Sequence, residues 1–286
     1  IGIFDGIHLG HQKILQFLAK EAKKHGLLSL VITFSPHPER VLDKSLICMI
    51  QTLEQRLDYI SKFEVQAALV IPFEKGFADL TGQDFIQKIV LDTLKAQEVI
   101  VGENFRFGKN QEGNLSSLHR SAVKLNFEVK SISSVFKDGI TVSSSLIRNL
   151  LQNGEIEKAR SLLGRPYEIK GEVIKGKSRG KQLGFPTANI QTDNEIIPQG
   201  VFITTAILDG EKFPSLTNIG KCPTFDQEES NIESYIINFN ADLYGKQITI
   251  RFEKKIRDEV QFDTPEDLSR QIEKDLAYAQ AYFKIG

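Results

Sequence analysis

The chain has 286 residues, enough for two domains, and its 41% hydrophobic and 26% charged residues are typical of a globular protein. Its 36 Lys and Arg nearly balance 37 Asp and Glu, which excludes a net field that would draw the whole molecule to nucleic acid or anionic lipid. No apolar run reaches the ~20 residues that span a bilayer. Cys48 and Cys222 are too few for a disulfide framework or a zinc site, which predicts a cytoplasmic protein.

The first half alternates helix-like and strand-like segments. The sequence opens inside what reads as a motif, so we expect a first strand to precede the numbered residues. We expect helices at 12–25, 53–63 and 84–94, and strands at 27–34, 67–71 and 98–101. Thr52 and Gln55 form a capping box for the second helix. This rhythm predicts a doubly wound parallel sheet with ligands at the carboxyl ends of the strands.

From about Tyr167 the periodicity changes to short β-rich runs separated by turn signals. We expect strands at 168–175, 201–208, 232–239 and 248–252, followed by one helix from Pro265. This pattern predicts a small antiparallel barrel or sandwich with a C-terminal helix. Between the halves, residues 145–163 read as two short linker helices. We expect a first domain over 1–160, including this linker, and a second domain over 161–286.

An H-x-G-H motif, His8 to His11, follows a tight turn at Gly6 and opens a helix. Imidazoles three residues apart at a helix start can both face a phosphate at its amino end, and Gly10 lets the backbone approach closely. Such a site stabilises charge that develops between the α- and β-phosphates of a nucleotide. Taken alone, the motif is better explained by two solvent-facing surface histidines. A metal site is disfavoured because no carboxylate or Cys cluster completes a ligand shell.

The motif S-S-S-L-I-R at 143–148 offers a second phosphate-binding device. Hydroxyls and amides at a helix N-terminus bind anionic oxygens, and Arg148 lies one turn beyond Ser144 on the same face. A serine-rich helix cap with a surface Arg is the alternative interpretation.

These motifs occur in one order, with F-S-P-H-P at 34–38 and V-G-E-N-F-R-F-G at 101–108 between them. In that order the first half resembles the FMN adenylyltransferase domain of prokaryotic FAD synthetases, within the wider H-x-G-H nucleotidylyltransferase superfamily. The resemblance implies an α/β nucleotidylyltransferase-like fold. It implies that ATP binds at Gly6, His8, Gly10, His11, Ser144, Ser145 and Arg148, with His8 and His11 catalytic. It implies that FMN binds at His37, Asn104 and Phe105.

One motif departs from the family pattern. The family usually reads I-S-S-T-R-I-R, whereas Ser145 here replaces Thr and Leu146 replaces the first Arg. The hydroxyl is kept but one positive charge is lost. We therefore expect adenylylation to be weaker or differently tuned.

The second half carries a glycine-rich cationic loop, G-K-S-R-G-K-Q-L-G-F-P-T-A-N-I at 176–190. Residues 171–178 also match the P-loop pattern G-x-x-x-x-G-K-[ST], but the following residues cannot start a helix well, so we reject that interpretation. Thr187 and Asn189 place two hard oxygens on one side of an extended segment, as Mg²⁺ shared with phosphates requires.

This loop resembles the riboflavin kinase signature, and the resemblance continues through N-I-G-K-C-P-T-F at 218–225, E-S-Y-I-I-N-F at 233–239 and I-R-D-E at 256–259. It implies that ATP binds at Gly176, Lys177, Arg179, Gly180, Thr187 and Asn189, with Mg²⁺ at the last two. No histidine follows His119, so a carboxylate must deprotonate the ribityl hydroxyl, and Glu233 occupies the family's catalytic-base position. A solvent-facing strand Glu is the alternative, and Arg257 either contacts the flavin or forms a structural ion pair.

The resemblance as a whole is to the prokaryotic bifunctional riboflavin kinase/FMN adenylyltransferase family. It implies an enzyme that phosphorylates riboflavin to FMN with ATP and Mg²⁺, then transfers AMP from ATP to FMN, giving FAD and pyrophosphate. We expect only these small-molecule partners, no nucleic acid or membrane, and a monomer or weak homo-oligomer. Three alternatives stay open: a kinase with a scaffold first domain, a flavin- or nucleotide-binding regulator without turnover, and an H-x-G-H transferase acting on pantetheine or a cytidyl substrate.

Overall fold

The computed structural model describes residues 1–42, 46–176, 184–223 and 228–285. Contacts divide the chain into two compact units, Ile1–Ser144 and Ser145–Gly286. The two helices at 145–163, which we expected to belong to the first domain, therefore group with the second unit. The second of them, α8 (Ile156–Leu163), buries Ile156, Ala159 and Leu163, and the Nη1 atom of Arg160 lies 3.1 Å from Glu253 Oε2 on a barrel strand. Its apolar face is thus covered by the second unit.

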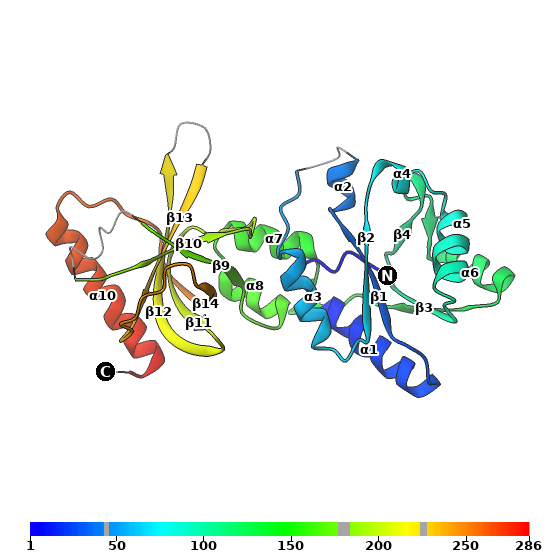
Figure 1. Ribbon diagram of the computed structural model, residues 1–286, viewed down its shortest axis with the longest axis horizontal. Coiled ribbons are helices and arrows are strands. Elements are labelled where there is room, and N and C mark those ends of the chain that lie inside the picture. Colours follow the sequence, from blue (N-terminus) through cyan, green and yellow to red (C-terminus); the bar gives the residue numbers. More distant parts are fainter. Residues whose placement is uncertain (43–45, 177–183, 224–227, 286) are drawn as a thin grey trace. The chain divides into compact units, whose positions relative to one another are not determined.

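The first unit alternates helices and strands (Figure 1), and its two main strand pairs are parallel, β1 with β2 and β3 with β6. Its elements are α1 (Leu9–His25), β1 (Leu30–Ser35), α2 (Pro38–Val41), α3 (Leu53–Ser61), β2 (Ala67–Pro72), α4 (Lys75–Ala78), α5 (Gly82–Asp84), the π-helix η1 (Phe85–Thr93), β3 (Glu98–Gly102), β4 (Arg106–Phe107), the 3-10 helix η2 (Lys109–Gln111), β5 (Gly113–Asn114), α6 (Leu115–Leu125), β6 (Glu128–Ile132), β7 (Phe136–Lys137) and β8 (Ile140–Thr141). The predicted α/β fold with parallel strands is confirmed.

Local sequence signals explain where these helices begin and end. Gly26 ends α1 in the left-handed conformation, at φ 65°, and the predicted capping box of Thr52 and Gln55 begins α3. The helix expected at 84–94 is mostly π-helical. The first residues run between the two strand pairs, where Gly2 N donates to Ile32 O and the Ile1 nitrogen donates to Ile100 O.

Two apolar clusters hold the first unit together. One joins α1, β1 and α3 through Leu15, Val31 and Ile60, and the other joins η1, β3 and α6 through Val90, Val101 and Leu118. Both clusters anchor the strands β1 and β3. The F-S-P-H-P and G-E-N-F-R-F-G loops therefore leave the carboxyl ends of firmly packed strands, as expected for ligand loops of an α/β fold.

The second unit is a closed antiparallel barrel with the strand order β10-β13-β12-β11-β14-β9. Its elements are α7 (Ser144–Gln152), of which only the first residue, Ser144, belongs to the first unit, α8, β9 (Glu168–Ile174), β10 (Ala188–Thr192), β11 (Gly200–Leu208), β12 (Glu211–Pro223), β13 (Glu228–Ile236), β14 (Gln247–Arg257) and α10 (Pro265–Phe283). The sequence predicted either a barrel or a sandwich, and the structure shows a barrel. Phe202 and Phe252 pack edge to face inside it, with ring centroids 5.1 Å apart.

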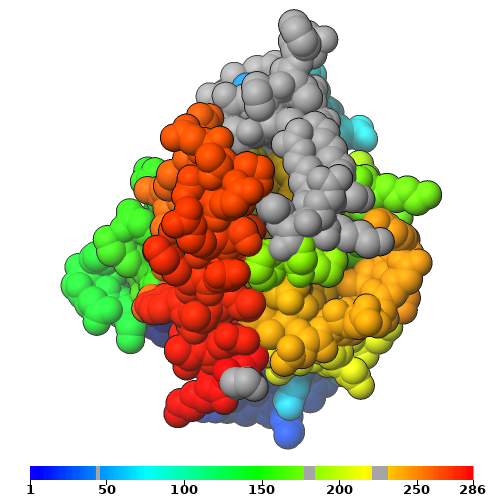
Figure 2. Space-filling view, turned by 90° about the vertical axis from the view of Figure 1, so that its left-hand side faces the viewer, coloured from blue at the N-terminus to red at the C-terminus, as the bar shows by residue number. Residues whose placement is uncertain are grey.

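The C-terminal helix α10 covers part of the barrel's outer face, as Figure 2 shows with this helix in red. Ala279 of α10 packs in one buried cluster with Val201 of β11 and Leu216 of β12. Side chains alternate along β13, so that Ile232 and Ser234 are buried while Glu233 between them stays partly exposed. Glu233 therefore lies on the outer face, on the same side of its strand as the residues that meet α10. Among the described residues, no helix combines the length and the apolar character needed to cross a membrane.

Candidate functional site

The turn before α1 has a strained backbone. Gly6 has φ 83°, and its neighbours Phe4 and Ile7 also lie in the left-handed region, at φ 56° and 39°. The left-handed conformation is unfavourable for a non-glycine residue, and it persists only where the surrounding structure holds the backbone in place. Asp5 helps to hold this backbone in place, because the residue is 1% exposed and its carboxylate accepts a hydrogen bond from Ile50 N at 3.0 Å. The chain thus enters α1 in one defined conformation.

The two histidines of H-x-G-H lie against each other at the amino end of α1. The His8 and His11 rings stack with centroids 3.6 Å apart, and His8 caps the helix by accepting a hydrogen bond from His11 N. A Cβ at position 10 would lie 3.1 Å from the His8 ring, so Gly10 makes room for this packing. His8 is only 7% exposed, which rules out a pair of solvent-facing histidines. A helix N-terminus flanked by imidazoles favours an anion.

The serine motif reaches this turn through its first helical residue. Ser144 Oγ donates to Asp5 O at 2.8 Å, although 139 residues separate the two along the chain. Ser145 and Arg148 follow on α7, in the second compact unit. The structure therefore joins Gly6, the histidine pair and Ser144 into one cluster within the first unit.

An aromatic cavity of about 430 Å³ lies in the first unit, within the range of small-molecule sites. Three residues predicted for FMN line it together: His37, Asn104 and Phe105. Its aromatic lining residues are Phe34, Phe73, Phe77, Phe85, Phe105 and Phe107. The rings of Phe105 and Phe107 are stacked, with centroids 5.4 Å apart and planes inclined by 14°. Flat walls of this kind suit a planar polycyclic ligand.

His37 shapes one edge of this aromatic cavity. It caps α2 by accepting a hydrogen bond from Glu39 N onto Nδ1 at 3.2 Å, which fixes its ring at the cavity wall. A larger cavity of about 730 Å³ lies elsewhere in the unit, and no predicted site residue is among the described residues that line it. Of these two cavities, the smaller, aromatic one is therefore lined by the residues that the sequence predicts for FMN.

In the second unit, the barrel register aligns three polar side chains. Asn189 of β10 lies directly opposite Glu233 of β13, and Asn218 of β12 lies opposite Glu233 on its other side. Directly opposite residues have Cβ atoms ~4.5–5.5 Å apart and project from the same face of a sheet. The carboxylate is held as well, because Asn231 Nδ2 donates to Glu233 Oε1 at 2.7 Å. We call Asn189, Glu233 and Asn218 the polar row.

Gly176 packs against this polar row. A Cβ at position 176 would lie 2.1 Å from Asn189 Nδ2, which is a severe overlap. Thr187 is half-buried and comes two residues before Asn189. Gly220 has a similar role beside Glu259, since a Cβ there would lie 2.2 Å from Glu259 Oε1. Glycines at these two positions therefore let the backbone approach the polar side chains. Lys177, Arg179 and Gly180 lie outside the described residues.

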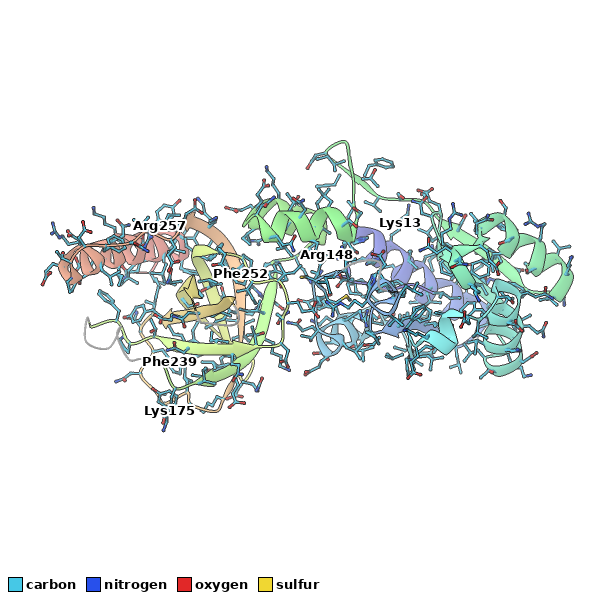
Figure 3. All side chains as sticks on the ribbon, turned by 90° about the horizontal axis from the view of Figure 1, so that it is seen from above. Lys13, Arg148, Lys175, Phe239, Phe252 and Arg257 are labelled. Carbon is cyan, nitrogen blue, oxygen red and sulfur yellow. The ribbon has the colours of Figure 1, made fainter. Side chains whose placement is uncertain are left out.

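Arg257 is held by an ion pair in the structure, beside α10 (Figure 3). Its Nη2 and Nε atoms donate to Asp275 Oδ2 at 2.7 and 3.0 Å, and its Nη1 atom donates to Asp258 O. Asp275 is 3% exposed, so removing Arg257 would leave a buried charge unpaired. The sequence left open whether Arg257 contacts the flavin or forms a structural ion pair. In the structure, Asp275 provides the partner for the ion pair.

Sequence reasoning assigned no role to Asp5, Asn218 or Asn231. Asp5 belongs to the quoted F-D-G turn and Asn218 to the quoted N-I-G segment, so both were within reach of the motifs. Their partners, however, lie on other elements: Ile50 follows α2, and Glu233 is on the next strand of the barrel. Only the three-dimensional pairing reveals these contacts.

Two family models match the chain, one described as FAD synthetase over residues 1–146 and one described as riboflavin kinase over residues 163–283. Among similar proteins, the bifunctional riboflavin kinase/FMN adenylyltransferase of Buchnera aphidicola subsp. Schizaphis graminum is 38% identical, over 100% of this chain and 93% of that protein. The proteins of the same name from Bacillus subtilis and Escherichia coli K12 are 37% and 34% identical, over 99% and 100% of this chain and 91% and 92% of their own lengths.

A solved structure is also similar over nearly the whole chain. The crystal structure of a protein from Streptococcus pneumoniae, described there as a macrolide-efflux protein, has a TM-score of 0.91 and 29% identity. The similarity covers 98% of this chain and 92% of that one. The two-unit architecture is therefore shared with a protein known by experiment.

Proposed function

Because the chain belongs to the bifunctional riboflavin kinase/FMN adenylyltransferase family, we propose that it phosphorylates riboflavin to FMN and then adenylylates FMN to FAD, using ATP in both steps. The observation that most supports two separate active sites is that each compact unit gathers several residues predicted for one of them, although Ser145 and Arg148 of the first set belong to the second unit. The histidine pair, Ser144 and the aromatic cavity lie in the first unit, and Gly176, Asn189 and Glu233 lie in the second.

In the second unit, Glu233 acts as the general base for phosphoryl transfer. Its carboxylate accepts the proton of the terminal ribityl hydroxyl as that oxygen attacks the γ-phosphate of ATP and ADP leaves. Asn231 orients the carboxylate, and Asn218 flanks it from the neighbouring strand. A positioned base in a fixed hydrogen-bonding environment needs little reorganisation before the proton moves.

Thr187 and Asn189 fit a magnesium ion, since a hydroxyl and an amide oxygen are hard donors beside a glycine that allows close approach. When bound, Mg²⁺ neutralises charge on the ATP phosphates. Lys177, Arg179 and Gly180 complete the proposed phosphate-binding loop. Mg²⁺ is also proposed for the adenylyl transfer, which uses a second ATP.

In the first unit, the phosphate of FMN attacks the α-phosphate of ATP and pyrophosphate leaves. The histidine pair and the positive amino end of α1 stabilise the charge that develops there, with Ser144 as a further phosphate contact. His37, Asn104 and Phe105 hold the flavin in the aromatic cavity. We propose a cytoplasmic enzyme that works as a monomer or weak homo-oligomer.

Variants of the histidine pair test the first-unit assignment. His8→Ala or His11→Ala should lower FAD formation from FMN and ATP by ~10²–10³, the usual cost of losing one donor to a developing phosphate charge. Riboflavin phosphorylation by the same preparation should stay within a few-fold of the parent, which makes it the internal control. Parental FAD formation in both variants would remove the histidines from the mechanism.

A further inference from the structure

Arg56 is a buried cation that the proposed mechanism does not use. It lies on α3, is 2% exposed and is among the largest fully buried side chains of the described residues. Burial lowers the pKa of its guanidinium, and the charge of Asp5 opposes that shift. Burying a charge costs free energy unless the charge is paired and hydrogen-bonded, so a buried guanidinium must be compensated by the contacts that it makes.

The hydrogen bonds of Arg56 connect two segments that carry the two ligand sites. Its Nη1 atom donates to Ile3 O at 2.8 Å, and its Nη2 atom donates to Phe34 O at 3.0 Å. Ile3 lies two residues before the strained turn at Asp5 and Gly6 that leads into the histidine pair. Phe34 lies near the end of β1, directly before the loop that holds His37, and both Ile3 and Phe34 line the aromatic cavity.

We propose that Arg56 is a positioning residue for adenylyl transfer. It connects the strained turn before α1 to the aromatic cavity and so sets the distance between the two substrates. This inference rests on the proposed function of the first unit. Arg56 contacts neither substrate; it acts through the carbonyls of Ile3 and Phe34 and through the charge of Asp5.

The guanidinium geometry explains why this position needs an Arg. Its fork presents two terminal N–H groups in fixed directions, which suits two carbonyls on separate segments. Asp5 completes the link, since it holds Ile50 N with its carboxylate and Ser144 Oγ with its backbone oxygen. A neutral side chain at position 56 would remove a positive charge from the surroundings of buried Asp5 and leave the segments of Ile3 and Phe34 unconnected.

The experiment compares Arg56→Gln and Arg56→Lys with the parent and with Val99→Ala. Val99 is 3% exposed in the core of the same unit and does not line the aromatic cavity, so its variant controls for loss of stability alone. For each protein we would measure melting temperature, FMN binding by flavin fluorescence, KM for FMN and for ATP in FAD formation, and riboflavin phosphorylation.

The Gln variant should raise both KM values roughly tenfold, or about 1.4 kcal/mol for each substrate, because the segments of Ile3 and Phe34 are no longer held in place and both substrates bind in a poorer position. The Lys variant should recover part of this effect, and riboflavin phosphorylation should be unchanged. If the Gln variant fails to fold, the Lys variant carries the test with an intermediate rise in both KM values.

Three outcomes would overturn the proposal: parental KM values in a folded Arg56→Gln protein, a rise in only one KM, or kinetic changes no larger than those of Val99→Ala at an equal melting temperature. A parent that binds FMN but makes no FAD would contradict the proposed function instead. In that case FMN binding still tests Arg56, because the Gln variant should bind FMN more weakly than Val99→Ala.

Discussion

Glu233 owes its proposed chemistry to its neighbours in the barrel. On its own strand it is a half-buried glutamate, and most such residues simply face solvent. The register adds Asn189 on one side and Asn218 on the other, and Asn231 donates a hydrogen bond to its carboxylate. Three amide side chains around one carboxylate form a polar site, which a strand glutamate that merely faces solvent does not need.

Glu233→Gln should lower kcat for FMN formation by ~10²–10⁴ with little change in the affinity for riboflavin, because the shape is kept while the proton acceptor is lost. FAD formation from supplied FMN should continue. Glu172→Gln, an exposed glutamate on β9, is the matched control and should behave like the parent. Near-parental turnover in Glu233→Gln would mean that Glu233 is a solvent-facing strand residue and not the base. Asp242 or Glu259 would then be the next candidate.

Gly176→Ala should damage the kinase through geometry alone. The added Cβ would overlap Asn189 Nδ2 at 2.1 Å, so the amide must move away from the polar row. Misplacement of a positioning group by about 1 Å can cost ~10² in rate, and we expect a loss of that order in FMN formation. Gly76→Ala, where a Cβ would meet open space, controls for the substitution itself. A fully active Gly176→Ala enzyme would show that Asn189 has no positioned role.

Residues that the sequence predicts from contiguous motifs lie together in the structure, while their roles stay predictions. The three residues predicted for FMN line one cavity, and Asn189 and Glu233 lie opposite each other. Arg56 could not be found in this way, because its carbonyl partners lie 53 and 22 residues away and any backbone has carbonyls. A side chain that acts by bridging backbone segments leaves no local pattern in the sequence.

Among the elements, the segments with local signals were predicted most accurately. The capping box of Thr52 and the left-handed Gly26 fix ends of α3 and α1 within the chain itself. The π-helical form of η1 has no such signal, because its apolar pattern also fits an α-helix. β13 spans Glu228–Ile236 rather than the expected 232–239, since pairing with β12, not propensity, determines its length.

Lys130 of β6 links three elements of the first unit, and its loss should weaken their association. Its Nζ atom lies 2.9 Å from Glu98 of β3 and also pairs with Glu21 of α1. The hydrogen bond from Lys130 lowers the pKa of the Glu21 carboxyl below its ordinary 4.5, against the effect of burial. A lowered pKa gives stability that is present above the ordinary value and is lost as pH falls through the lowered value.

Lys130→Met should therefore lower the melting temperature most at about pH 7, and the difference from the parent should shrink at about pH 3 as the carboxylates protonate. Lys24→Met is the control, because Lys24 is largely exposed and lies 3.9 Å from Glu21, so its pair contributes little. Thermal unfolding across this pH range makes the comparison. A difference independent of pH would mean that packing, rather than the ion pairs, gives Lys130 its effect.

At the scale of the whole molecule, the change of periodicity near Tyr167 predicted two differently built parts. The linker helices could not be assigned from the sequence, because an amphipathic helix does not reveal which core covers it. The structure groups α7 and α8 with the barrel, where α8 is joined to β14 through Arg160 and Glu253. A kinase fragment should therefore begin at Ser145 rather than near residue 160.

Residues 145–286 expressed alone should convert riboflavin to FMN and make no FAD, because the histidine pair and the aromatic cavity lie outside the fragment. Its kinase rate should be within a few-fold of that of the full chain. A fragment from residue 164, which lacks both α7 and α8, should be less stable, since the apolar face of α8 no longer covers the barrel. FAD formation by the 145–286 fragment would show that the assignment of the two activities is wrong.

The account depends most on one chain performing two successive reactions, and a single time course tests this. The purified full-length protein would be incubated with riboflavin, ATP and Mg²⁺, and flavins would be resolved by chromatography, with a parallel sample in excess EDTA. We predict that FMN forms first and FAD follows as FMN accumulates, with both reactions stopped by EDTA. Conversion that ends at FMN, or no conversion of riboflavin in the presence of Mg²⁺, would contradict the account.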